Sequence, residues 1–202
     1  MTELPPSAPG MRIGLFGGSF NPPHDGHRLV SRESLKRLGL DAVWWLVTPG
    51  NPLKDTSDLA PLADRVIAAR ALVDHPKVKV TGFEAANGFT YTYQTLDFLT
   101  RTLPDRRFVW IMGADSLASF DRWERWDDIF EMMPIAVYVR PGSTSRAPLS
   151  KAAQRFANAR LDEADARLLP ISPAPAWVFL HGLMSGLSST ALRQGNGSAP
   201  LT

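Results

Sequence analysis

Short apolar runs alternate along the chain with stretches in which apolar residues recur every three or four positions. The runs fall at residues 12–16, 42–47, 78–80, 108–112, 135–139 and 177–180. Helical spacing falls at residues 25–38, 62–73, 92–102, 115–130 and 149–168, the last two with room for a break. Uninterrupted apolar runs are typical of parallel strands covered on both faces. The alternation therefore predicts an α/β protein with a doubly wound, Rossmann-like parallel sheet.

Turn-forming residues follow four of the predicted strands, at Gly17, Thr48, Gly113 and Arg140. In open α/β sheets ligands bind beyond the carboxyl ends of the strands. We therefore expect these four loops to lie on one rim and to carry the functional site. A short closing helix is predicted at residues 188–194, with Ser188 or Ser189 as its cap.

The length of 202 residues fits a single domain, whose core would bury roughly 70% of the surface of the unfolded chain. The proline-rich residues 1–10 are predicted to form a flexible leader, residues 11–194 the single domain, and residues 195–202 a tail. The sequence leaves the oligomeric state open, a homo-oligomer included.

Composition excludes several classes of protein. The chain has no cysteine, which excludes disulfides, thiol catalysis and cysteine-ligated metals. Its longest apolar run, residues 42–47, is far short of the roughly 20 residues that a membrane span needs, so no membrane partner is expected. The net charge of +2 is too small to indicate a nucleic-acid partner. Residues 1–10 lack the features of a secretory signal, and a cytoplasmic location is expected.

The segment between the first predicted strand and the first predicted helix carries the most chemistry. It reads Gly17-Gly18-Ser19-Phe20-Asn21-Pro22-Pro23-His24-Asp25-Gly26-His27, which matches neither the dinucleotide fingerprint nor the Walker A loop. Glycines allow the backbone to approach a ligand closely, and the start of a helix favours an anion. Because His24 and His27 are three residues apart, they share a helix face and can reach the same phosphate.

Two simpler interpretations of this segment are weaker. A zinc half-site is disfavoured because only His75 and His181 remain as further histidines and cysteine is absent, so no metal site is predicted. A role in turn formation alone would explain the glycines and Asn21, but not the two histidines.

The same segment resembles the G-x-F-[DN]-P-x-H-x-G-H signature of the nucleotidyltransferase superfamily. Residues 187–193, Leu-Ser-Ser-Thr-Ala-Leu-Arg, resemble the I-S-S-T-x-I-R motif of that superfamily. The resemblance implies an ATP site made of Gly17, Gly18, Ser19, Phe20, His24, His27, Ser188, Ser189, Thr190 and Arg193. It also implies that the catalytic residues are His24, His27 and Arg193. The departures, such as Asn21 where many members have Asp, affect no phosphate-directed group.

The middle of the chain resembles one branch of that superfamily, the bacterial nicotinate-nucleotide adenylyltransferases. Residues 90–96 are similar to its S-Y-T-x-D-T-L motif, with Gln94 in place of Asp, and residues 113–117 with Trp123 and Trp126 are similar to G-x-D-S-L…W. This resemblance implies a mononucleotide site made of Gly18, Ser19, Asn51, Lys54, Tyr91, Thr92, Asp115 and Trp123.

Two of these assignments have an alternative. Trp123 is spaced with Trp126 and Phe130 as on one helical core face, which would make it a packing residue. Lys54 also fits a surface lysine in a turn, and the role of Asn51 stays open with it.

The resemblance implies a reaction of ATP with nicotinate mononucleotide that gives nicotinate adenine dinucleotide and pyrophosphate. It also implies Mg²⁺, held mainly by the ATP phosphates. The phosphate of the mononucleotide is itself a nucleophile, so the protein need only position the substrates and neutralise charge. The alternatives are a sister enzyme that acts on nicotinamide mononucleotide or phosphopantetheine, and a nucleotide-binding regulator without turnover.

Overall fold

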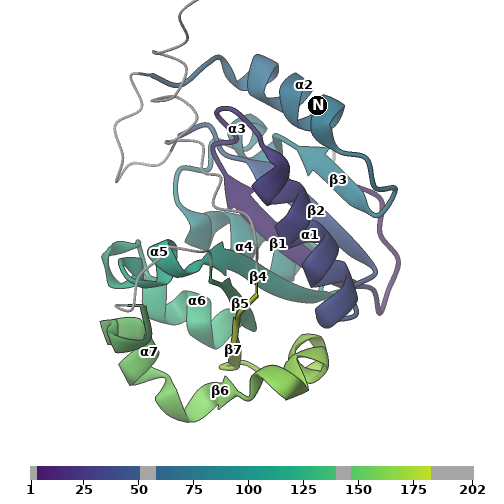
Figure 1. The fold of residues 1–202 in the computed structure, drawn as a ribbon. Coiled ribbons are helices and arrows are strands. Elements are labelled where there is room, and N and C mark those ends of the chain that lie inside the picture. Colours follow the sequence, from purple (N-terminus) through teal and green to yellow (C-terminus); the bar gives the residue numbers. More distant parts are fainter. Residues whose placement is uncertain (1–3, 51–57, 140–146, 183–202) are drawn as a thin grey trace, which may run out of the picture.

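A computed structural model of the chain describes residues 4–50, 58–139 and 147–182 (Figure 1). Within these residues seven parallel strands form one sheet, in the order β3-β2-β1-β4-β5-β7-β6. The strands are β1 (Arg12–Gly18), β2 (Ala42–Val47), β3 (Val78–Thr81), β4 (Arg107–Gly113), β5 (Ile135–Tyr138), β6 (Arg160–Leu161) and β7 (Trp177–Leu180). The predicted doubly wound α/β sheet is confirmed. The direction of winding reverses between β1 and β4, and this is where such sheets bind ligands.

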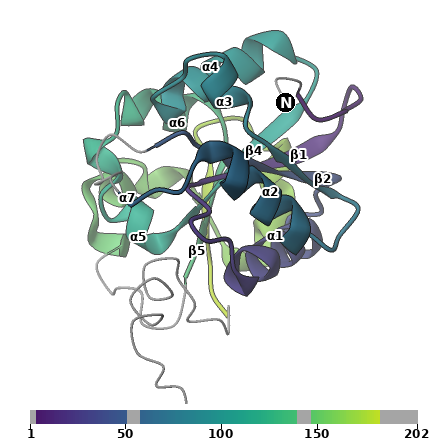
Figure 2. The ribbon, with the colours of Figure 1, turned by 90° about the horizontal axis from the view of Figure 1, so that it is seen from above.

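Helices cover both faces of the sheet, as the view from above shows (Figure 2). The α-helices are α1 (Asp25–Arg37), α2 (Leu62–Leu72), α3 (Phe83–Ala86), α4 (Thr92–Thr102), α5 (Ala114–Leu117), α6 (Trp126–Met132) and α7 (Lys151–Arg155). Four 3₁₀ segments complete the described part of the chain: η1 (Phe120–Arg122), η2 (Ala147–Leu149), η3 (Ala157–Ala159) and η4 (Glu163–Ile171).

Each face of the sheet has its own apolar core. Successive residues of a strand point to opposite faces, and β2 illustrates this because Trp44 packs in one core and Trp45 in the other. The core around Trp45 receives side chains from α1, α2 and η4, whereas the core around Trp44 receives them from α4 to α7. The strands therefore need apolar residues at consecutive positions, which is why the sequence shows them as uninterrupted runs.

The stretch predicted as helical at residues 115–130 is broken into α5, η1 and α6. Arg125 adopts a left-handed backbone conformation (φ 51°) directly before α6, and Trp123 is extended. Trp123 therefore does not share a helix with Trp126 and Phe130, and the interpretation of the three as one helical core face is wrong. The spacing misled because the side chain of Trp123 leaves a turn and not a helix.

The stretch predicted as helical at residues 149–168 also differs from that prediction. It contains α7, which has five residues, then η3, the two-residue strand β6 and the 3₁₀ segment η4. Strand β6 pairs with β7 at the edge of the sheet, and Arg160 and Leu161 give no apolar run that would indicate it. The predicted closing helix at residues 188–194 lies outside the described residues.

Residues 4–10 run beside the loop that precedes β4. The Arg106 side chain donates to the backbone oxygen of Ser7 at 2.9 Å, and the amide of Gly10 donates to the backbone oxygen of Asp105 at 2.7 Å. In the described part of the chain no helix is both long enough and apolar enough to cross a membrane.

Candidate functional site

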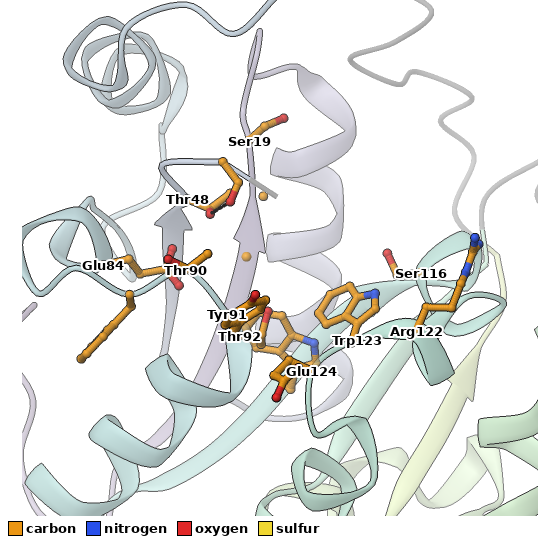
Figure 3. A pocket seen from close by; sticks show the side chains of 15 residues that line it. Ser19, Thr48, Glu84, Thr90, Tyr91, Thr92, Ser116, Arg122, Trp123 and Glu124 are labelled. Carbon is orange, nitrogen blue, oxygen red and sulfur yellow. Dashed lines mark hydrogen bonds between the residues drawn. The ribbon is translucent and has the colours of Figure 1, made fainter. Parts of the chain in front are cut away.

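A cavity of about 430 Å³ opens at the carboxyl ends of β1, β2 and β4, beside the point where the winding reverses (Figure 3). Small-molecule sites commonly measure about 300–1,000 Å³. It is lined by Gly17, Gly18, Ser19, Thr48, Gly50, Glu84, Phe89, Thr90, Tyr91, Thr92, Trp110, Ser116, Arg122, Trp123 and Glu124. The loops at Gly17 and Thr48 thus share one rim, as expected, whereas Arg140 lies outside the described residues.

The structure brings together six of the residues predicted from the motifs. Gly17, Gly18, Ser19, Tyr91, Thr92 and Trp123 all line the cavity. Asp115 is exposed at the start of α5, next to the lining residue Ser116. Phe20, His24 and His27 are not lining residues. Phe20 lies in the turn that follows Ser19, and the two histidines lie at the start of α1. The other predicted residues, Asn51, Lys54, Ser188, Ser189, Thr190 and Arg193, lie outside the described residues.

His24 and His27 together cap the first turn of α1, because each ring accepts one backbone N–H group. Nδ1 of His24 accepts the amide N–H of Gly26, and Nδ1 of His27 accepts the amide N–H of His24, both at 3.1 Å. The ring centroids are 3.9 Å apart. This is the reciprocal arrangement of a capping box, with imidazoles in place of hydroxyl and carboxylate.

The capping bonds also decide where each neutral imidazole carries its proton. A nitrogen that accepts a hydrogen bond cannot hold the proton, so the proton lies on Nε2 of both rings. His24 and His27 are thereby prepared as N–H donors at the positive end of a 13-residue helix. Such a pair suits an anion and needs no imidazolium charge.

Phe20 supports His27 and does not face the cavity. Its backbone is left-handed (φ 48°), which is uncommon for any residue other than glycine. This conformation directs the ring into the core, where it is 1% exposed and stacks on Trp45 with centroids 4.9 Å apart. The same ring lies 4.6 Å from the His27 ring. Strained backbone of this kind is found where the surrounding structure fixes a functional side chain.

One wall of the cavity is the turn that precedes α4. Oε1 of Gln94 accepts the amide N–H groups of Thr90 and Tyr91, at 2.9 and 3.0 Å. These bonds hold the loop that carries the lining residues Thr90, Tyr91 and Thr92. The amide oxygen of Gln94 satisfies these N–H groups, although the resembling motif has Asp at this position.

Glu84 is a buried lining residue that the sequence did not indicate. Oε1 accepts the hydroxyl of Thr95 at 2.7 Å, while Oε2 is buried without a hydrogen-bond partner among the described residues. Burial raises the pKa of Glu84, and the hydrogen bond from Thr95 only partly opposes this. The raised pKa favours the neutral carboxyl, which would not repel an anionic ligand.

Trp123 also lines the cavity, near Tyr91 and Thr92 in the view of Figure 3. The indole is partly buried, lies edge-on to Trp110 with centroids 6.4 Å apart, and contacts Phe120 at 4.9 Å. An indole that remains accessible from a cavity offers a planar aromatic ligand a surface to stack on.

Among the described residues no group of three or more His, Cys, Asp or Glu side chains could hold a metal ion.

Residues 15–195 match the model of a protein family described as cytidylyltransferase-like. A protein of Methylorubrum extorquens (strain PA1) named "Probable nicotinate-nucleotide adenylyltransferase" is 62% identical over 183 residues, 91% of this chain and 99% of the relative. A protein of the same name from Agrobacterium fabrum (strain C58) is 57% identical over 183 residues, 91% of this chain and 98% of the relative.

A solved structure with a similar fold is Plasmodium falciparum nicotinic acid mononucleotide adenylyltransferase complexed with NaAD. Its TM-score is 0.67 at 16% identity, with 90% of this chain and 82% of that chain covered. At this identity the likeness supports the α/β architecture alone.

Proposed function

The chain belongs to the cytidylyltransferase-like family, and from this premise we propose that it transfers the adenylyl group of ATP to nicotinate mononucleotide. The products are nicotinate adenine dinucleotide and pyrophosphate, and the reaction is a step of NAD biosynthesis. The proposal rests most on one observation: a pair of histidine donors stands at the start of α1, a few residues after the segment 17–19, which lines a cavity together with aromatic side chains. The enzyme acts as a single domain over residues 11–194, in the cytoplasm.

The reaction forms one P–O bond and breaks another. A phosphate oxygen of nicotinate mononucleotide attacks the α-phosphorus of ATP, and the bond from that phosphorus to the oxygen bridging to the β-phosphorus breaks. Pyrophosphate leaves with the electron pair. The attacking phosphate is ionised at neutral pH, so the mechanism needs no general base.

The protein accelerates this step by holding the substrates in line and by stabilising charge on the triphosphate. His24 and His27 donate from Nε2 to phosphate oxygens, and the amide dipoles of α1 add to the same field. The backbone of Gly17, Gly18 and Ser19 lies beside the nucleotide. Ser188, Ser189, Thr190 and Arg193 complete the ATP site by their likeness to the closing motif of the family.

The acceptor occupies the aromatic end of the cavity. Its pyridine ring stacks on Trp123 and lies against Tyr91 and Thr92, with its phosphate toward Gly18 and Ser19. Asp115 lies beside the ribose, and Asn51 and Lys54 are assigned to this site by the resemblance alone. Aromatic lining residues favour a planar, electron-poor ring, and the pyridine of the mononucleotide is such a ring.

Mg²⁺ enters as the magnesium complex of ATP and therefore as part of the substrate. The described residues offer no carboxylate cluster for a resident ion, and Mg²⁺ is commonly held by substrate phosphates and water with few protein ligands. The ion supplies neutralisation of triphosphate charge. The chain itself contributes the histidine donors to this stabilisation of charge.

A coupled pyrophosphate assay with ATP and three separate acceptors tests the proposal. Nicotinate mononucleotide should give the highest kcat/KM, ahead of nicotinamide mononucleotide and of phosphopantetheine. Preference for either of the other two would identify a sister enzyme. No pyrophosphate release with any acceptor, from protein that melts cooperatively, would instead indicate a nucleotide-binding regulator.

A further inference from the structure

Arg65 on α2 is a charged side chain buried beneath the rim of the cavity. The residue is 3% exposed, and its guanidinium has no carboxylate partner among the described residues. It is not a lining residue. We infer that Arg65 is a positioning residue, which fixes the loop after β1 against the loop after β2 and so sets the width of the cavity at Ser19 and Thr48. The inference rests on the proposed function.

The guanidinium binds backbone oxygens from three separate segments. Nη1 donates to the oxygen of Ser19 and to that of Thr48, both at 2.8 Å. Nη2 donates to the oxygen of Pro49 at 3.2 Å, and Nε donates to that of Ala60 at 2.8 Å. A single terminal nitrogen therefore joins the ends of two neighbouring strands, and both joined residues line the cavity.

Only an arginine can make this set of bonds. A guanidinium presents five N–H groups on three nitrogens in a rigid plane, whereas the three N–H groups of a lysine ammonium all lie on one nitrogen. Burial lowers the pKa of Arg65, yet arginine starts so high that the group stays charged at neutral pH. A charge kept in such a place indicates that its hydrogen bonds fix a specific arrangement of the loops.

Asn21 also holds the segment that precedes α2. Its Nδ2 donates to the backbone oxygen of Asp58 at 2.9 Å, and its Oδ1 accepts the amide N–H of Ala60 at 3.2 Å. Asn21 and Arg65 thus both bind Ala60, and both connect the turn after β1 to the chain before α2. The amide of Asn21 supplies a donor and an acceptor, and an Asp at this position would have no N–H for Asp58.

The first experiment measures hydrogen exchange and does not depend on activity. We expect Arg65→Met to raise amide exchange at least tenfold in peptides that cover residues 17–21 and 46–50. Peptides from β4 and β5 should exchange as in the wild type. Arg70→Met is the matched control, because Arg70 is an exposed arginine on the same helix. Uniform faster exchange in all peptides, or no change in any, would overturn the inference.

The second experiment measures kcat and KM well below the melting temperature of each variant. A displacement of about 1 Å at a reacting centre can lower rates by about 10²-fold. Arg65→Met should therefore lose about 10²-fold in kcat/KM for nicotinate mononucleotide, and Arg65→Lys about tenfold, while Arg70→Met should match the wild type. Full activity of folded Arg65→Met would mean that Arg65 contributes only to stability and would overturn the inference.

The two experiments separate this inference from the proposed function. If wild-type protein releases no pyrophosphate, the proposed function fails, and the exchange pattern alone decides on Arg65. If Arg65→Met does not fold, Arg65→Lys decides on both readouts. It must then show local exchange at residues 17–21 and 46–50 together with reduced kcat/KM, and the absence of either result would overturn the inference.

Discussion

The indole of Trp110 lies so close to Gly17 that a Cβ on residue 17 would come within 2.5 Å of its Cη2 atom. Gly17 is on β1, Trp110 is on the neighbouring strand β4, and both line the cavity. The sequence suggested that Gly17 lets a ligand approach the backbone. In the structure this glycine also makes room for the wall of the site.

Gly17→Ala should therefore displace the Trp110 indole. Overpacking of this kind destabilises by about 1–3 kcal/mol, and the displaced indole should also lower kcat/KM. Trp110→Phe removes the atoms that clash, so Gly17→Ala should destabilise less in that background. Chemical denaturation of the two single variants and the double variant measures this coupling. Equal destabilisation in both backgrounds would show that Trp110 is not what requires the glycine.

His24 has two separable roles, because it caps α1 through Nδ1 and offers Nε2–H to an anion. His24→Ser keeps a capping oxygen and removes the Nε2 donor, whereas His24→Ala removes both. We expect His24→Ser to melt close to the wild type and His24→Ala to lose about 1 kcal/mol. Both should lower kcat by roughly 10²–10³-fold. Wild-type turnover by His24→Ser would leave His24 as a cap only.

His27→Ala should lower kcat by roughly 10²–10³-fold, the loss typical of one preorganised donor. The fold should survive, because Phe20 remains stacked on Trp45 below the missing ring. Steady-state kinetics and a thermal melt on the same preparation measure both effects. Wild-type melting together with wild-type turnover would contradict the assignment of His27.

Trp123→Ala should affect the acceptor far more than ATP. Loss of a stacking ring amounts to about 1–3 kcal/mol, so the KM for nicotinate mononucleotide should rise roughly 5- to 150-fold. Trp126→Ala is the control, because Trp126 packs against Phe156 and is not a lining residue. It should lower the melting temperature and leave both KM values in place. Parallel loss for both substrates in Trp123→Ala would contradict the stacking role.

Glu163 joins the end of β7 to α1, because its carboxylate pairs with Arg37 and accepts from the ring and the amide of His181. Burial alone would raise the pKa of Glu163, and the hydrogen bonds from Arg37 and His181 outweigh it and lower the pKa to about 2. A folded-state pKa below the unfolded value near 4.5 stabilises the protein above pH 4.5, and this contribution is lost as the pH falls toward 2.

Glu163→Gln should thus be less stable than the wild type at pH 7, by about 1 kcal/mol or less because the pair is partly exposed. The difference should shrink below pH 4.5. Urea unfolding between pH 7 and pH 3 measures it, with Glu131→Gln as a control at an exposed residue of α6. A difference that stays constant across this range would contradict the lowered pKa.

The sheet could be predicted from the sequence, whereas its edge and its irregular turns could not. Strands buried on both faces, such as β2, need consecutive apolar residues, and this signal is local. Strand β6 has only two residues, and its pairing with β7 depends on the fold as a whole. The left-handed Arg125 breaks the predicted helix at a residue that carries no glycine or proline signal.

The candidate site likewise contains residues that could be predicted from the sequence and residues that could not. Residues in contiguous motifs, such as Gly18 and Thr92, could be found in the sequence, and they do line one cavity. Glu84 and Arg65 could not, because their roles depend on contacts with segments distant in the chain, as between Arg65 and Ser19. No local pattern shows that a charged residue of a helix will face inward.

Isotope labelling tests whether an oxygen of the mononucleotide phosphate becomes bonded to the α-phosphorus of ATP. Wild-type protein is incubated with unlabelled ATP and with nicotinate mononucleotide whose phosphate oxygens are ¹⁸O. Mass spectrometry then measures the ¹⁸O content of each product. All of the label should appear in nicotinate adenine dinucleotide, and the pyrophosphate should be unlabelled. Label in the pyrophosphate, or no dinucleotide at all, would contradict attack of the mononucleotide phosphate on the α-phosphorus.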